Sequence, residues 1–247
     1  MSTKVTDPTS KSNSGFLWGL GVLLLIIAGV IGYIVWSGQG AKTEHLAERE
    51  VTPVAMTLTY DNGKATLSSD KATKDTPTIE IFEDFSCPYC GELAKGTDAD
   101  MKKAIEEGKL NVVIRTLNFL DGKDLESSSG HSTKAAAAMN AVAQAGDVQT
   151  YWNLRDVLMQ SQKDVYNKWD IEDFANAAKE LGAEKDVVDA IKKADIKELG
   201  NTPAAANAKE LEEETGELSS PRVIYQDKDL IGDNENIMKW LDKALAL

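Results

Sequence analysis

Cys87 and Cys90 are the only cysteines in the 247-residue chain, and two residues separate them in the segment FSCPYC at 85–90. An apolar-rich run at 78–85 predicts a strand directly before the pair, and residues 87–108 predict a helix. The start of a helix carries partial positive charge and unsatisfied N–H groups, which stabilise an anion there. We therefore expect a thiolate at Cys87, because thiolates are the reactive species in thiol–disulfide exchange.

Other chemistries of such a cysteine pair fit this sequence less well. Structural zinc takes four ligands, whereas the only histidines are His45 and His131, far apart in the sequence. No metal site is therefore predicted. A purely structural disulfide would close a very small loop and would remove little entropy from the unfolded chain. We favour redox chemistry, with Pro88 and Tyr89 as parts of the same site, since a proline at the first helical position gives up no needed N–H.

The chain is acidic, with a formal net charge of −13. An acidic protein repels the phosphates of DNA and RNA, so no nucleic-acid partner is predicted. The charge does not argue against unfolded polypeptide as a substrate.

Residues 15–36 form a 22-residue segment without a charged side chain. At about 1.5 Å per residue, a helix of this length crosses a hydrocarbon core of ~30 Å. Trp18, Tyr33 and Trp36 suit the two membrane–water interfaces. A secretory signal has a shorter apolar region, so we predict an uncleaved transmembrane anchor, with cleavage within 37–41 as the alternative.

The orientation of this segment is weakly encoded, because Lys4 and Lys11 before it nearly balance Lys42 and Arg49 after it. Cysteines used for oxidation belong outside the reducing cytosol. We therefore predict a single-pass protein of the cell membrane, with a cytoplasmic tail at 1–14 and the catalytic domain on the extracytoplasmic side.

The rest of the chain reads as a linker at 37–53 and one domain at 54–247. A hairpin is predicted at 54–67, and the strand–helix–strand succession that follows is a βαβ unit with parallel strands. A helical block at about 124–216 then interrupts the strands. A sheet that is interrupted by helices and later completed is one domain with an insertion.

Periodicity and glycine punctuation place the later elements. They are helices at 132–145, 148–160, 171–181, 185–193 and 202–214, strands at 222–225 and 230–231, and a last helix at 234–245. Trp152, Trp169 and Phe174 are expected in the core of the helical block.

The segment FEDFSCPYC at 82–90, between a strand and a helix, resembles the active site of the thioredoxin superfamily. With the helical block and Ser220-Pro221 before a strand, residues 54–247 are similar to DsbA-like disulfide oxidoreductases. The resemblance implies an α/β thioredoxin-like fold with a helical insertion, here preceded by an N-terminal transmembrane helix, and it calls for no cofactor. It also implies a cis peptide bond at Pro221, opposite the cysteines, with Ser220 and Pro221 binding the substrate.

The sequence departs from the family in one respect. Members often carry a buried acid six residues before the first cysteine, where it relays protons, and here that residue is Ile81. Glu83 lies two residues further on and, by strand alternation, on the same face; Asp84 lies closer still. Glu83 is therefore a candidate proton relay.

The resemblance implies a membrane-anchored extracytoplasmic enzyme that introduces disulfide bonds into exported proteins. A substrate thiolate would attack the exposed sulfur of oxidised Cys87, and a second substrate thiol would resolve the mixed disulfide. Cys90 would be the resolving cysteine in the opposite direction. The implied partners are exported proteins with cysteine thiols and a membrane quinone-linked enzyme that reoxidises the pair.

Two alternatives stay open. The same chemistry in the opposite direction would make the protein a reductase or isomerase of exported thiols, which a reduction potential near that of thioredoxin would indicate. A non-catalytic thioredoxin-fold binding or chaperone module would leave Cys87 with an ordinary thiol pKa.

Overall fold

The computed structural model describes residues 14–38, 42–232 and 234–247, and it divides into two compact units, Met1–Ala41 and Lys42–Leu247. In the first unit the described residues form helix α1 (Ser14–Gly38), whose side chains are described for 18–31. Over the described part of the chain, no helix is both long and apolar enough to cross a membrane. The predicted tail lies outside the described residues except for Ser14, and the anchor stays a prediction.

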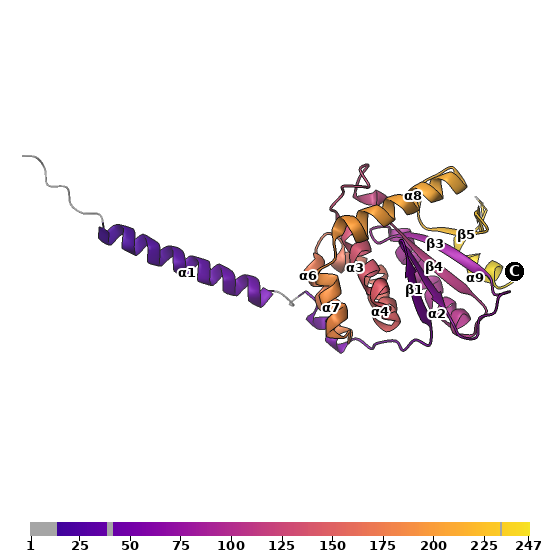
Figure 1. The fold of residues 1–247 in the computed structure, drawn as a ribbon, viewed down its shortest axis with the longest axis horizontal. Helices are drawn as coiled ribbons and strands as arrows, with labels where there is room; N and C mark the ends of the chain where they lie inside the picture. Colours follow the sequence, from indigo (N-terminus) through magenta and orange to yellow (C-terminus); the bar gives the residue numbers. More distant parts are fainter. Residues whose placement is uncertain (1–13, 39–41, 233) are drawn as a thin grey trace, which may run out of the picture. The chain divides into compact units, whose positions relative to one another are not determined.

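A six-stranded mixed sheet forms the centre of the second unit (Figure 1), in the order β1-β2-β4-β3-β5-β6. Strands β3 and β4 are parallel, and the other neighbouring pairs are antiparallel. The strands are β1 (Thr57–Asp61), β2 (Lys64–Ser68), β3 (Thr78–Asp84), β4 (Asn111–Leu117), β5 (Arg222–Tyr225) and β6 (Lys228–Asp229).

Strands β1 and β2 form the predicted hairpin, with Asp61 opposite Lys64. The two turn residues, Asn62 and Gly63, have φ of 45° and 84°. Positive φ at both turn positions is what a two-residue hairpin requires, and asparagine followed by glycine supplies it at low cost.

The predicted βαβ unit is confirmed: helix α2 (Pro88–Glu106) connects β3 to the parallel strand β4. Although glycine weakens a helix interior and two glycines lie at 91 and 96, α2 is one unbroken helix. Gly91 instead permits a close approach, since an added Cβ would lie 2.8 Å from the Gln162 side chain and from the Met159 carbonyl oxygen.

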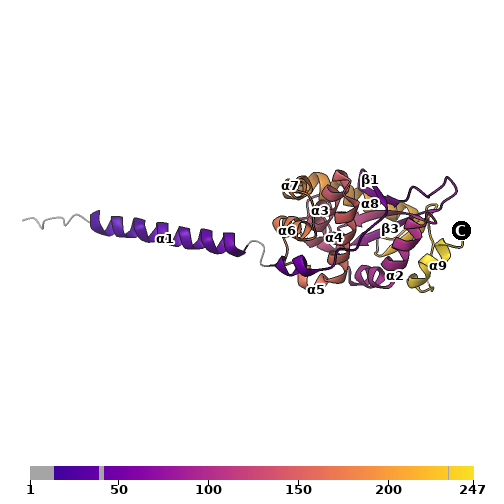
Figure 2. The same ribbon diagram turned by 90° about the horizontal axis from the view of Figure 1, so that it is seen from below.

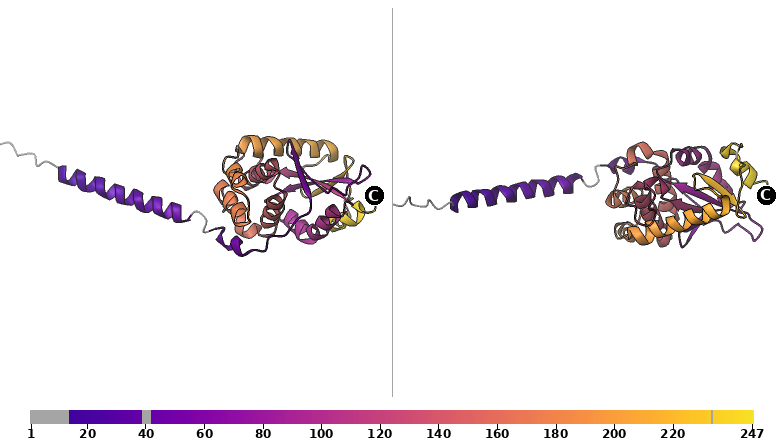
Figure 3. Two further views of the ribbon diagram at one scale, coloured as in Figure 1. Left: turned by 60° about the horizontal axis from the view of Figure 1, so that its bottom comes forward. Right: turned by 90° about the horizontal axis from the view of Figure 1, so that it is seen from above.

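Helices cover the sheet on both faces (Figures 1 and 2), with α8 on one side and α2 and α9 on the other. Helices α3, α4, α6 and α7 gather to one side of the sheet, in the predicted insertion (Figure 3). The predicted core residues Trp152, Trp169 and Phe174 are all buried.

The helices and helical turns after β4 are the 3-10 turn η2 (Phe119–Asp121), α3 (His131–Ala145), α4 (Val148–Gln160), α5 (Gln162–Val165), α6 (Ile171–Glu180), α7 (Lys185–Lys192), a π-helical turn (Ile196–Asn201), α8 (Thr202–Thr215), the 3-10 turn η4 (Ile237–Lys239) and α9 (Trp240–Ala244).

The structure differs from the predicted linker at 37–53 from residue 42 onward, because the second unit begins at Lys42. Leu46 is buried in the main core, and Lys42 Nζ lies 2.6 Å from Asp173 Oδ2. Residues 39–41 lie outside the described part of the chain. Leu46 is the one fully buried apolar side chain of residues 42–53, and charged residues surround it in the sequence, which is why the segment reads as solvated.

Two predicted elements near the C-terminus are displaced. The return strand expected at 230–231 is β6, two residues earlier, because Gln226 and Asp227 form a tight turn with φ of 49° and 61°. The last helix, expected from Asn234, begins as η4, where the Asn236 side chain accepts a hydrogen bond from the Met238 N–H at 3.0 Å.

Candidate active site

The two cysteines lie where β3 ends and α2 begins. The Cys87 N–H donates to the Asp84 carbonyl oxygen at 2.9 Å, and Cys87 is the N-cap of α2, with Pro88 in the first turn. Proline is tolerated there because its missing N–H would have no intrahelical partner. Cys87 and Cys90 are both free thiols. The strand–helix junction predicted for the cysteine pair is confirmed.

A second chain segment reaches the cysteines from β5. The Ser220–Pro221 peptide bond is cis, as the resemblance implied. The Cys87 Sγ–H donates to the Ser220 carbonyl oxygen at 3.3 Å. Pairing of Arg222 with Phe82 in the sheet holds this segment beside the end of β3. Residues 133 positions apart in sequence therefore meet at one sulfur atom.

The environment of Cys87 lowers its thiol pKa from 9.0 to about 6. The hydrogen bond from the Cys90 thiol to the Cys87 sulfur is the largest favourable cause, and burial acts against it. The Ser220 hydroxyl and the backbone N–H groups of Cys90 and Tyr89 contribute further. The helix start therefore stabilises the thiolate as expected, but the neighbouring thiol contributes more.

The Ser220 hydroxyl is the one side chain of the β5 segment that acts on the sulfur. Its oxygen is buried and, among the described residues, has no partner that meets full hydrogen-bond geometry. It nevertheless lies close enough to Cys87 to favour the thiolate. A hydroxyl hydrogen rotates about the C–O bond, so this group can donate to a charged sulfur beside it.

The pKa of Cys90 is raised well above its ordinary value. Burial is the largest cause, followed by the hydrogen bond to Cys87 and the negative charges of Cys87 and Glu83. The two cysteines are thus held in different protonation states at neutral pH, which is the condition for one to act as nucleophile and leaving group and the other to carry a proton.

Access to the pair is narrow. Only 5% of Cys87 is exposed, so the exposed sulfur predicted from the sequence is largely covered. Tyr89, between the cysteines, is 69% exposed, and Pro88 is also exposed. A reacting sulfur must therefore approach past Tyr89 and the Ser220–Pro221 segment.

Glu83 lies on the face of β3 toward α2, as strand alternation predicted, since Arg155 bridges it to Asp98 of α2. Its charge also acts on Cys90. Both of its carboxylate oxygens accept hydrogen bonds from Arg155, at 2.9 and 2.7 Å. Glu83, Arg155 and Asp98 are all buried. The guanidinium thus occupies both oxygens of Glu83, and the role of Glu83 as a proton relay stays a prediction.

Asp84 is the buried acid that holds the loop before Cys87. Its carboxylate accepts hydrogen bonds from the Ser132 hydroxyl at 2.5 Å, the Ser86 N–H at 2.9 Å and the Leu120 N–H at 3.2 Å. Burial outweighs these bonds and raises the pKa of Asp84 to about 7. This carboxyl, on the opposite face of β3 from Glu83, therefore takes up a proton far more readily than an ordinary aspartate.

The histidines do not gather into a metal centre. Across the described residues, no group of three or more histidine, cysteine and acidic side chains is placed to hold a metal ion. His131 is buried between Tyr166 and Phe174, and burial lowers its pKa to about 4.

Comparison with protein families matches residues 71–243 to the family described as Thioredoxin. The chain belongs to the thioredoxin family. The match covers the cysteine pair, the whole helical insertion and the segment that carries the cis-proline.

Similar solved structures indicate which kind of thioredoxin-family protein this chain is. MdbA, a thiol-disulfide oxidoreductase from Corynebacterium diphtheriae, is similar at a TM-score of 0.73 and 43% identity, over 80% of this chain and 98% of MdbA. MdbA from Corynebacterium matruchotii is similar at 0.71 and 40% identity, over 82% and 98%. This thioredoxin-family protein is a DsbA-like thiol–disulfide oxidoreductase, as its motif predicted.

A curated relative shares only part of the chain. The serine/threonine-protein kinase PknE of Mycobacterium tuberculosis is 32% identical over 119 residues, which is 47% of this chain. The chain matches only 21% of the length of that kinase, and no kinase activity is inferred from it.

Sequence reasoning missed three side chains of this thioredoxin-family site: Ser132, Arg155 and Gln162. The Gln162 amide donates to the Cys87 carbonyl oxygen at 2.9 Å. Nothing in the local sequence points to Ser132 or Gln162. Arg155 had a signal, because it lies four residues after Tyr151 in an amphipathic helix, on the face that should be buried.

Proposed function

We propose that the protein oxidises pairs of cysteine thiols in exported proteins to disulfides, anchored to the membrane by residues 15–36. The observation that carries this proposal is the pKa of Cys87, about 6, beside the raised pKa of Cys90. A stable Cys87 thiolate stabilises the reduced enzyme, and a stable reduced form makes the disulfide a stronger oxidant.

The reaction proceeds in two displacements. A substrate thiolate attacks the Cys87 sulfur of the Cys87–Cys90 disulfide, the S–S bond breaks, and Cys90 leaves with the electron pair and takes a proton. A second substrate thiolate then attacks the substrate sulfur of the mixed disulfide, and Cys87 leaves as a thiolate. The substrate gains a disulfide and loses two electrons to the enzyme, which ends with Cys87 ionised and Cys90 protonated.

The Ser220–Pro221 segment is the proposed binding element for the substrate. Its backbone lies at the Cys87 sulfur, and Ser220 already accepts a hydrogen bond through its carbonyl oxygen. An extended peptide laid along this segment would present its cysteine to Cys87 by main-chain pairing, a form of strand addition.

The location and the reoxidant are part of the same proposal. The uncharged segment at 15–36 supports a single-pass anchor with the catalytic unit on the extracytoplasmic side. A membrane quinone-linked enzyme would then return the Cys87–Cys90 pair to its disulfide form after each cycle. A non-catalytic binding module is disfavoured because it gives no reason for a lowered pKa at Cys87.

The direction is tested by measuring the reduction potential of the pair in the full-length chain, together with oxidation of a reduced, unfolded substrate protein. We expect a potential nearer the oxidising end of the range from about −270 to −120 mV, and substrate disulfides formed in equal amount to the enzyme disulfide consumed. Cys87→Ser abolishes the reaction. Cys90→Ser keeps the Cys87 thiolate, and when it is mixed with a substrate whose cysteines already form a disulfide, Cys87 attacks that disulfide and a mixed disulfide with the substrate accumulates. A potential near −270 mV, or an active Cys87→Ser protein, contradicts the proposal.

A further inference from the structure

Arg155 is a buried cation that reaches the cysteine pair from the helical insertion. It lies on α4, and its guanidinium donates two hydrogen bonds to Glu83 of β3 and one, at 2.6 Å, to Asp98 of α2. All three charged side chains are nearly inaccessible. One side chain therefore ties together the strand that ends at the active site, the helix that begins there, and the insertion.

The charges of this cluster do not balance by themselves. Two carboxylates face one guanidinium, and the Glu83 charge already acts on Cys90. Burial raises the pKa of Asp98 to about 6, while Arg155 opposes that rise. From α4 itself, the buried Tyr151 hydroxyl and the partly exposed Asp156 are the other titratable groups that act on the cluster.

The first displacement of the proposed reaction places a new negative charge on Cys90, the leaving group. The Glu83 carboxylate raises the pKa of Cys90 through its charge, because a like charge without compensation disfavours ionisation. In a buried site with little screening, a compensating cation matters more than it would in water. Arg155 is the cation that the fold holds on both Glu83 oxygens.

We propose that Arg155 is a positioning residue for the disulfide exchange: it fixes Glu83 and offsets its charge, so that the Cys90 sulfur can leave when the disulfide opens. This inference rests on the proposed function. It makes the helical insertion part of the redox chemistry, because the cation is supplied by α4.

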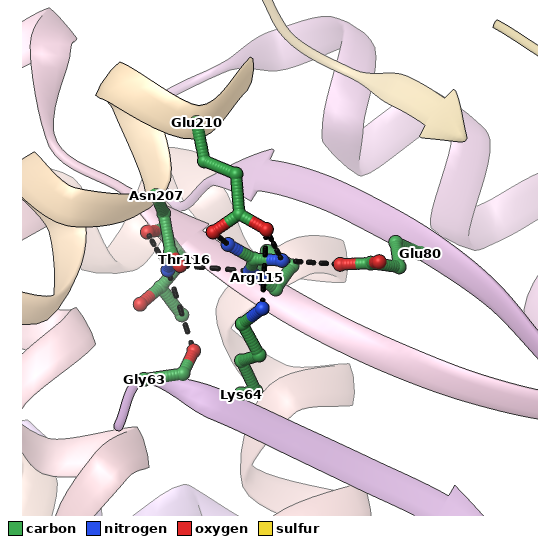
Figure 4. Close-up of polar contacts among 7 residues, drawn as sticks. All are labelled: Gly63, Lys64, Glu80, Arg115, Thr116, Asn207 and Glu210. Atoms are coloured by element: carbon green, nitrogen blue, oxygen red, sulfur yellow. Dashed lines mark hydrogen bonds and ion pairs between the residues drawn. The ribbon is translucent and has the colours of Figure 1, made fainter. Parts of the chain in front are cut away.

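The other buried arginine provides a matched control (Figure 4). Arg115 of β4 pairs with Glu80 and, at 2.5 Å, with Glu210 of α8, and its guanidinium lies over the Phe82 ring. Glu80 and Phe82 project from the face of β3 opposite to Glu83, by strand alternation. Arg115→Met thus removes an equally buried cation with two carboxylate partners and leaves the cluster beside Cys90 intact.

The experiment compares Arg155→Met, Arg155→Lys and Arg115→Met in the full-length protein. The readouts are the redox equilibrium with glutathione and the rate at which the oxidised enzyme forms a mixed disulfide with a thiol peptide, over a range of pH. For Arg155→Met we expect about a tenfold shift of the equilibrium toward the disulfide, which corresponds to a potential lower by ~30 mV. The rate falls as well, because the Glu83 carboxylate then opposes the negative charge that develops on Cys90 without a compensating cation. Arg155→Lys keeps the cation, so its equilibrium and its rate change less than those of Arg155→Met. Arg115→Met leaves both readouts unchanged.

A second change separates charge from packing. Adding Glu83→Gln to Arg155→Met removes the uncompensated carboxylate, and it should restore both the equilibrium and the rate. If Arg155→Met does not fold, the double variant and Arg155→Lys carry the comparison. The inference is overturned if the folded Arg155 variants match wild type or Arg115→Met, or if Glu83→Gln gives no rescue. If the wild-type protein does not oxidise thiols, the proposed function is overturned instead. The redox equilibria of the wild type and the Arg155 variants can still be compared in that case, so the two failures are distinguishable.

Discussion

The two cysteines show how one residue type acquires opposite properties three positions apart. Cys87 caps a helix, and the Cys90 thiol, the Ser220 hydroxyl and nearby backbone N–H groups lower its pKa, so its anion is stabilised. Cys90, one turn further into the helix, lies in the core, where burial disfavours charge. The asymmetry comes from position and not from any additional charged side chain at Cys87.

This asymmetry predicts how the stability of the reduced protein depends on pH. The folded-state pKa of Cys87, about 6, lies below its ordinary value of 9.0. Between these values the unfolded state binds more protons, so the free energy of unfolding of the reduced protein rises with pH. At about 1.4 kcal/mol per pKa unit, the gain is on the order of 4 kcal/mol, and it is lost as pH falls through about 6. Above pH 9 the raised pKa of Cys90 reverses the trend.

The measurement is denaturant unfolding of the reduced and the oxidised protein across this pH range. The oxidised protein carries the same chain without free thiols, so the difference between the two isolates the cysteines. Reduced Cys87→Ser should lose the rise. Parallel curves for the reduced and oxidised proteins would show that the thiolate is not stabilised in the folded state.

At the scale of elements, the active-site helix is held by close contact with the insertion. Gly91 of α2 approaches the Met159 carbonyl and the Gln162 side chain, at the point where α4 passes into α5. The Gln162 amide in turn donates to the carbonyl oxygens of Phe85 and Cys87. Contacts with the insertion therefore fix the N-terminal part of α2, and the local sequence of the helix does not show them.

Gly91→Ala should therefore destabilise the protein by about 1–3 kcal/mol, the usual cost of overpacking. Its Cβ would lie 2.8 Å from a backbone carbonyl oxygen, which cannot move aside cheaply. Gly96→Ala is the matched control on the same helix, since its Cβ would lie 3.1 Å from the sulfur of Met238, a flexible side chain. Denaturant midpoints measure both. Equal midpoints for the two variants would contradict the close contact at Gly91.

At the scale of the whole molecule, the sequence predicts features that are local and misses those that are not. The hairpin, the βαβ unit and the insertion helices follow from turn residues and periodicity, and the cysteines and Pro221 from a family motif. Arg155 contacts Glu83 across 72 positions, and Ser132 contacts Asp84 across 48. No periodicity encodes such pairs, because they exist only once the insertion has folded onto the sheet.

The N-terminal boundary of the catalytic unit is also set by contacts between distant segments, and truncation of the chain tests where it lies. Leu46 is buried, and Thr52 exchanges hydrogen bonds with the Asn153 side chain at 2.8 and 3.0 Å. Burial of one leucine contributes about 1.5–3 kcal/mol. Without Thr52 the buried Asn153 oxygen loses its donor, although the amide nitrogen keeps the Gln149 carbonyl oxygen, and an unsatisfied buried polar group costs about 1–3 kcal/mol. A chain that starts at residue 54 should therefore be less stable than one that starts at Lys42 by on the order of 3 kcal/mol.

Denaturant unfolding of the two shortened chains and of the full-length protein decides where the unit begins. The chain from Lys42 should unfold at the same denaturant concentration as the full-length protein, because the described contacts of Leu46, Thr52 and the cysteine pair all lie within Lys42–Leu247. Asn153→Ala in the chain from Lys42 should reproduce part of the loss, since it removes the same hydrogen bonds without shortening the chain. If the chain from residue 54 were as stable as the longer ones, residues 42–53 would be a tether that contributes nothing to the stability of the catalytic unit.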